Sequence, residues 1–236
     1  MFGNITSRFG SYSKKTFKPI KGYREGSKHE QLHSYTRTTL GSGDLRLAVQ
    51  LPPSENLNDW LSVNTVDFFN EVSLLYGIVF DDTGRFSRPG EGFPSGFEYL
   101  WVPESKSSSS RKGTPQKCSA PQYVEYVMSW VEDQINKEEV FPIVSDSVYP
   151  KDFKKVVSTI FKRLFRVFAI VYCSHFETIE QLGAAKHLNT SFKHFIFFSL
   201  EFELLPRREM DPLDALVTPL IAEFNGMKKS LESNEN

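Results

Sequence analysis

Cysteine is scarce in this sequence: there are only two, Cys118 and Cys173, and they form no CxxC pair. A disulfide framework is therefore not expected, and both thiols should be reduced. The sequence also lacks any apolar run near the roughly 20 residues that span a bilayer. Its basic N-terminus has no apolar stretch typical of a secretory signal. These absences predict a protein of the cytoplasm, with the nucleus as a second location.

Net charge is almost absent as well. The chain has 28 Lys and Arg against 29 Asp and Glu, which gives a formal net charge of -1. A nearly neutral chain has no overall attraction to nucleic acid or anionic lipid, so any charge-driven recognition must come from local patches. We expect neither nucleic acid nor membrane as a partner, and a monomer when the protein is free. Because 21 of the 236 residues are Phe, a sizeable core can be built.

The charge is distributed unevenly along the chain. Residues 1–24 contain no Asp or Glu, several Ser and Gly, and six basic residues: Arg8, Lys14, Lys15, Lys18, Lys21 and Arg24. This composition predicts a flexible basic arm over residues 1–27. We expect a single helical domain over residues 28–226 and a disordered tail over residues 227–236.

Hydrophobic spacing predicts a mainly α-helical domain. Apolar residues recur every three or four positions between Phe153 and Val171, which is typical of one buried helix face. Further helices are expected over 28–40, from 54 or 56 to 76, over 119–135, 177–186 and 189–202, and from 211 onward. Two short apolar segments, 78–80 and 97–102, flank a Gly- and Pro-rich excursion and suggest a small β-hairpin. The long loop over 102–116 has no assigned role. A helical bundle with a small hairpin fits these signals.

One segment matches a catalytic motif. Residues 29–33 read His-Glu-Gln-Leu-His, the HExxH pattern of zinc proteases, in which two His share a helix face. Glu55 is a possible third ligand, but Pro52 and Pro53 separate it from the motif. A solvated polar helix face is the favoured interpretation. Because no phosphate-binding glycine loop and no GxSxG elbow is present either, we expect no catalytic residues and no enzymatic activity.

Three cations gather on the most regular helix. Lys162, Arg163 and Arg166 lie within five residues, and Lys162 and Arg166 project from the side opposite the apolar stripe. An ordinary solvated face is one interpretation. The other is an anion clamp, since two guanidinium groups and an ammonium group can converge on the oxygens of a phosphate.

A second, acidic surface is expected on an earlier helix. No Lys or Arg occurs between Leu51 and Asp82, whereas six carboxylates do: Glu55, Asp59, Asp67, Glu71, Asp81 and Asp82. Trp60 precedes Asp67 by seven residues, which places both on one stripe. An aromatic ring beside carboxylates suits the binding of a basic helix. The alternative is that Trp60 belongs to the edge of the core.

These segments resemble the Mob (Mps one binder) kinase-activator family, which has the Mob/phocein fold. The similarity runs from about Lys15 to Phe224. It depends on six blocks in order: KTFKP at 15–19, TLGSGDLR at 39–46, NTVDFFN at 64–70, KCSAP at 117–121, KRLFR at 162–166 and HLNTSFKHFIFF at 187–198. The branch that activates NDR/LATS-type kinases is the most similar one. The resemblance implies a helical bundle with a four-helix core and no enzymatic activity.

The resemblance also implies two partners. Family members bind the N-terminal regulatory segment of NDR/LATS-type kinases, and they bind phosphothreonine peptides of upstream kinases or scaffolds. It assigns the phosphopeptide pocket to Lys162, Arg163 and Arg166. It assigns the kinase surface to Glu55, Asp59, Trp60 and Asp67, and regulatory phosphorylation to Thr16 and Thr39. A phocein-like scaffold subunit that activates no kinase is the alternative function.

One departure from the family pattern concerns a metal. Members usually carry a structural zinc held by two Cys and two His, and the corresponding positions here are Thr83, Arg88, Ile170 and His175. No shift of the alignment restores the Cys pair, because neither Cys nor His occurs between His33 and Cys118. A structural zinc needs four good nitrogen or sulfur ligands. We therefore expect no zinc and no other cofactor.

Overall fold

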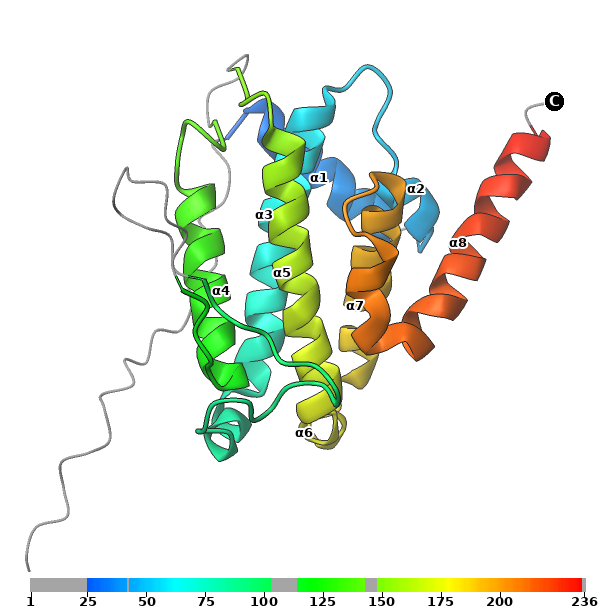
Figure 1. Ribbon diagram of the computed structural model, residues 1–236. Coiled ribbons are helices and arrows are strands. Elements are labelled where there is room, and N and C mark those ends of the chain that lie inside the picture. Colours follow the sequence, from blue (N-terminus) through cyan, green and yellow to red (C-terminus); the bar gives the residue numbers. More distant parts are fainter. Residues whose placement is uncertain (1–24, 42, 103–113, 143–147, 235–236) are drawn as a thin grey trace, which may run out of the picture.

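The structure is a computed structural model that describes residues 25–41, 43–102, 114–142 and 148–234. Within these ranges the chain folds into a bundle of helices, as the sequence predicts (Figure 1). The elements in order are α1 (Lys28–Gly41), α2 (Leu45–Val49), α3 (Leu57–Ile78), η1 (Phe80–Arg85), α4 (Ala120–Ile135), α5 (Phe153–Ser174), α6 (Phe176–Gln181), α7 (Ala185–Glu201), η2 (Arg207–Leu213) and α8 (Asp214–Asn234). None of these helices is long and apolar enough to cross a membrane.

Helices α3 and α5 run side by side through the centre, with α4 on one side and α7 on the other (Figure 1). The apolar stripe of α5 is buried along its whole length, which confirms the periodicity: Phe153, Val157, Ile160, Leu164, Val167 and Val171. Phe161 of α5 stacks on Phe195 of α7, with ring centroids 5.0 Å apart. Phe68 of α3 meets the same two rings edge to face. Aromatic rings at these separations add to the hydrophobic burial that joins the helices.

Side-chain caps define where several helices begin. The amide oxygen of Asn56 accepts hydrogen bonds from the backbone N–H groups of Asn58 and Asp59 at the start of α3. Ser27 accepts one from Glu30 N–H at the start of α1. Such caps satisfy backbone donors that have no partner within the helix.

The expected β-hairpin is wrong. In the described residues there is no strand, and the only β-type pairing is a single bridge between Trp101 and Gln116. Ile78 is the last residue of α3, and Phe80 begins η1. Short apolar runs cannot be told from a helix end by periodicity alone, so these signals were ambiguous.

Some boundaries also differ from the expected ones. Helix α7 begins at Ala185 rather than at Asn189, and α6 ends at Gln181. The backbone of α8 stays helical to Asn234, beyond residue 227, where we expected a disordered tail. Its last segment, Met-Lys-Lys-Ser-Leu-Glu, is rich in helix-favouring residues, which explains the extension. The short α2 was not predicted, although Asp44 caps it by accepting from Leu47 N–H.

Candidate functional site

Two of the three predicted cations converge on one carboxylate. Lys162 and Arg166 lie one turn apart on α5, and both face Glu209 of η2. The Nζ of Lys162 is 2.9 Å from Glu209 Oε1, and the Nη2 of Arg166 is 3.2 Å from Glu209 Oε2. Arg166 also donates through Nη1 to the hydroxyl of Tyr123 at 3.0 Å. The pair therefore already binds an anionic group, one that belongs to the chain itself.

The third cation, Arg163, has different neighbours. Its guanidinium lies 3.7 Å from the ring centroid of Trp130 on α4 and 4.7 Å from that of Trp101. A guanidinium stacked on aromatic rings in this way is attracted to their faces and held in a defined orientation. The structure thus holds the guanidinium of Arg163 against Trp130 and Trp101, and Arg163 follows Lys162 directly on α5.

The three charged groups of this cluster are partly exposed. The side chains of Lys162, Arg166 and Glu209 retain 34%, 26% and 16% of their accessibility. Burial alone would raise the pKa of Glu209, but Lys162 and Arg166 lower it overall. Burial would lower the pKa of Arg166, but Tyr123 and Glu209 raise it overall. Both groups are therefore charged at neutral pH, so Glu209 and Arg166 meet as an ion pair.

The predicted acidic residues lie against α1. The Nζ of Lys28 is 3.3 Å from Glu55 Oε2 and 3.2 Å from Asp59 Oδ2. Further along, the Nδ1 of His33 lies 2.8 Å from Asp67 Oδ2. Burial raises the pKa of Asp67, and the hydrogen bond with Asp67 raises that of His33. The three carboxylates form one row, which we call the acidic row, and cations or imidazoles of α1 already contact it.

The family resemblance assigns Trp60 to the kinase surface, and the structure contradicts this assignment. Its side chain is wholly buried, with 0% exposure. The indole Nε1–H donates to the carbonyl of Val49 at 3.4 Å, and the ring packs near Tyr35 and Phe198. The residue therefore anchors α3 to its neighbours, as the alternative interpretation held. A partner could reach this ring only after the core had opened.

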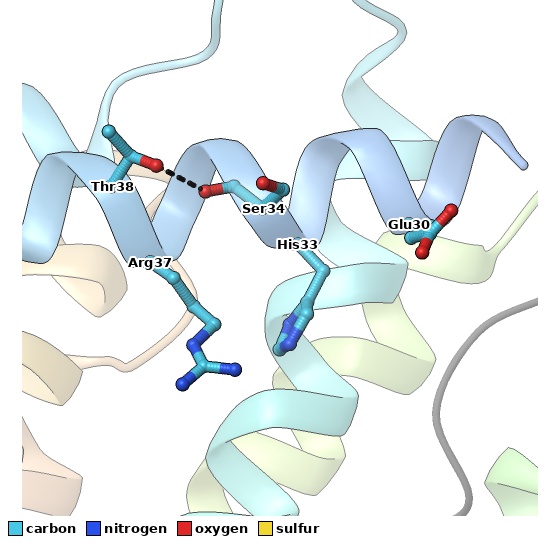
Figure 2. Close-up of a pocket in the computed structure, with 5 residues that line it drawn as sticks. All are labelled: Glu30, His33, Ser34, Arg37 and Thr38. Atoms are coloured by element: carbon cyan, nitrogen blue, oxygen red, sulfur yellow. Dashed lines mark hydrogen bonds between the residues drawn. The ribbon is translucent and has the colours of Figure 1, made fainter. Parts of the chain in front are cut away.

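The HExxH segment lies on α1, and its two histidines contact different carboxylates of α3. His29 Nε2 is 3.5 Å from Asp59 Oδ1, whereas His33 bonds to Asp67. Glu30 and His33, with Ser34, Arg37 and Thr38, line a shallow groove of about 370 Å³ (Figure 2). Within the described ranges, no group of three or more His, Cys, Asp and Glu could hold a metal. These contacts fix α1 on α3, and they do not have the arrangement of a protease site.

Comparison with known proteins identifies the family of this chain. The family model of the Mob1/phocein family matches residues 37–213. The chain belongs to this family. It is 49% identical over 213 residues to MOB kinase activator-like 1 homolog B of Dictyostelium discoideum, with 90% of this chain and 96% of that protein covered. It is 46% identical over 212 residues to MOB kinase activator-like 1A of Arabidopsis thaliana, with 90% and 96% covered.

The residues at the expected zinc positions of this Mob1/phocein chain do not fit a zinc ion. Thr83 donates its hydroxyl to the carbonyl of Phe80, and Ile170 is buried in the core. The side chain of Arg88 is 85% exposed. Only His175 has a donor suited to zinc, and its Nδ1 lies 2.6 Å from Asp82 Oδ2. One imidazole among these four residues is too few for a structural site.

The expected phosphorylation sites are not described. Thr16 lies outside the described residues. Thr39 belongs to the last turn of α1, but its side chain lies outside the described part.

Sequence reasoning missed several groups at these sites. Glu209 is 43 positions from Arg166, so no local pattern joins them. Tyr149, whose hydroxyl donates to Asp59 at 2.9 Å, is 90 positions from its partner. Lys28 could have been noticed, because it is the cation that immediately precedes the HExxH motif.

Proposed function

We propose that this protein is a non-catalytic activator of a protein kinase of the NDR/LATS type. Its relatives at 45–49% identity are named MOB kinase activator-like proteins, and almost their whole length is covered. The protein acts by binding the N-terminal regulatory segment of the kinase and favouring its active conformation. A phosphothreonine peptide of an upstream kinase or scaffold binds at a second surface. We place these encounters in the cytoplasm.

The acidic row receives the kinase segment. Glu55, Asp59 and Asp67 retain 30%, 18% and 23% of their side-chain accessibility. A basic segment shares or replaces the contacts that Lys28 and His33 make with these carboxylates. Complementary charge of this kind speeds association and fixes the register of a docked helix.

The phosphothreonine binds to Lys162, Arg163 and Arg166. The observation that carries this assignment is the Glu209 carboxylate, because Lys162 and Arg166 each contact one of its oxygens. Groups arranged to hold two carboxylate oxygens can also hold phosphate oxygens, with charge-assisted hydrogen bonds. Arg163, the residue after Lys162 on α5, supplies a third positive charge, and its guanidinium stacks on Trp130.

Regulation and metal content complete the proposal. Phosphorylation adds a dianion within the basic arm at Thr16 and near the end of α1 at Thr39, and it changes how the arm and α1 dock. The protein works without zinc, since three of its four candidate positions carry no suitable ligand.

A kinase assay tests the proposal. An NDR-type kinase should gain activity when the full chain is added, and Glu55→Gln/Asp59→Asn should reduce both binding and activation by about tenfold. Asp133→Asn removes an exposed carboxylate of α4 and should change neither. Absence of binding, or binding without activation, would refute kinase activation and favour the phocein-like scaffold instead.

A further inference from the structure

Glu209 differs from the other carboxylates of its segment. It lies on η2, a short turn of helix whose neighbours Met210 and Leu213 are buried. Its backbone N–H donates to the carbonyl of Pro206 at 2.9 Å. Asp211, from the same segment, has a side chain that is 58% exposed and that faces Arg207 at 3.5 Å. Of these two acids of η2, Glu209 is the one that points to the cations of α5.

The Glu209 carboxylate contacts two cations at once. Each oxygen takes a different partner, Lys162 for Oε1 and Arg166 for Oε2. The packing of η2 against α5 keeps this carboxylate beside the two cations, which gives it a high effective concentration there. A free anion can take both partners only when the carboxylate of Glu209 moves away.

Charge decides which anions can make that exchange. A peptide carboxylate brings one negative charge and two oxygens, so it replaces Glu209 with a group of the same kind and gains little. A phosphothreonine brings roughly two charges and three acceptor oxygens. It can engage Lys162, Arg166 and the adjacent Arg163 together, and this gain offsets the lost contacts of Glu209.

We infer that Glu209 is an intramolecular competitor that occupies the phosphate position in the free protein and lowers the affinity of the site for anionic peptides. The inference rests on the proposed phosphopeptide function and names its regulation. Glu209 keeps out acidic peptides and admits phosphothreonine. It also holds Lys162 and Arg166 in place until the phosphate arrives.

Fluorescence anisotropy with three labelled peptides tests this inference. One peptide carries phosphothreonine, the second carries Glu at that position, and the third carries unmodified Thr. Glu209→Gln keeps the shape of the side chain and removes its charge. It should bind the phosphothreonine peptide about tenfold tighter than the wild type, because a charged contact to each cation no longer competes. The Glu peptide should gain by a similar factor, which is the signature of competition.

Two further variants make the result decisive. Asp211→Asn removes one charge from the same segment without touching the cations, so its affinities should equal those of the wild type. An unchanged or weaker affinity of Glu209→Gln overturns the inference. A gain confined to the phosphothreonine peptide also overturns it, because a competitor at the anion position must hold back the Glu peptide as well. Thermal unfolding of each variant checks that it is folded.

The triple variant Lys162→Ala/Arg163→Ala/Arg166→Ala tests the phosphopeptide function separately from the competitor role of Glu209. If the wild type binds the phosphothreonine peptide and the triple variant does not, the site stands, and Glu209→Gln alone decides the competitor role. If the triple variant binds as well as the wild type, the phosphopeptide function fails and the competitor role fails with it.

Discussion

Asp82 and His175 lie 2.6 Å apart, measured from Oδ2 to Nδ1, and this contact joins η1 to the end of α5. Arg85 extends the connection, since it lies 3.1 Å from Asp82 and also donates to the carbonyl of Ser174. Ser174 in turn donates to the carbonyl of Gly92 at 2.7 Å. Side chains of this protein thus connect the two segments at the place where the family resemblance implies a zinc clip.

The metal content should therefore be negligible. Purified protein is expected to contain much less than one zinc per chain, and dialysis against a chelator should leave its melting temperature unchanged. The reason is that Thr83, Arg88 and Ile170 offer no nitrogen or sulfur ligand of the kind that structural zinc needs. Elemental analysis checks the content. Stoichiometric zinc, or a chelator-induced fall in melting temperature, would show that other residues bind the metal.

The contact between Asp82 and His175 should contribute measurably to stability. Asp82→Asn is expected to lower the free energy of unfolding by about 1–3 kcal/mol, because His175 is wholly buried and would lose a charged hydrogen-bond partner. Burial alone would raise the pKa of Asp82, but the contacts with His175, Thr178 and Arg85 lower it overall. Urea denaturation measures the change. Asp81→Asn, at the exposed neighbouring position, is the matched control and should have almost no effect.

Stability should fall in mild acid because of His194. This imidazole is buried against Phe68, and burial lowers its pKa from 6.5 to about 4. The unfolded chain takes up the proton below pH 6.5, whereas the folded one resists protonation until about pH 4. The free energy of unfolding should therefore be about 2 kcal/mol smaller at about pH 5 than at about pH 7.5.

The variant His194→Leu tests the assignment of this acid sensitivity. The substitution removes the titrating group. The free energy of unfolding of the variant should therefore lack the loss of about 2 kcal/mol between about pH 7.5 and about pH 5. His33 acts in the opposite direction. The hydrogen bond with Asp67 raises the pKa of His33 in the folded protein, so this contact stabilises the fold below the usual pKa of histidine. The stabilisation is lost as the pH rises through the raised pKa. Urea denaturation at both pH values gives the comparison. Equal pH dependence in variant and wild type would refute the role of His194.

The sequence predicted the helices well where the apolar period was long. The stripe of α5 is an example, because six inward positions decide how a helix packs regardless of its ends. Segments 78–80 and 97–102 were wrongly predicted to form a hairpin, because segments this short show no hydrophobic period. Trp60 was left open because burial of a residue near a helix start depends on α2, an element too short to leave a pattern.

The sequence predicted only those contacts of the candidate site that join residues close together in the chain. The proximity of Lys162 and Arg166 follows from a spacing of four on a helix. Their partner Glu209 comes from a segment that follows α7, and only the tertiary fold brings it there. The same holds for the contacts of α1 with the acidic row, since His33 and Asp67 are 34 positions apart. Long-range pairing of this kind has no signature in a single sequence.

The central claim is that two separate surfaces bind two partners at once, and simultaneous binding tests it most directly. The affinity for a phosphothreonine peptide should be the same with and without a saturating kinase N-terminal segment. Lys162→Ala/Arg163→Ala/Arg166→Ala should abolish binding of the peptide only, and Glu55→Gln/Asp59→Asn should weaken binding of the kinase segment only. If the two ligands exclude one another, or if either variant loses both, the two surfaces are one site and the account is wrong.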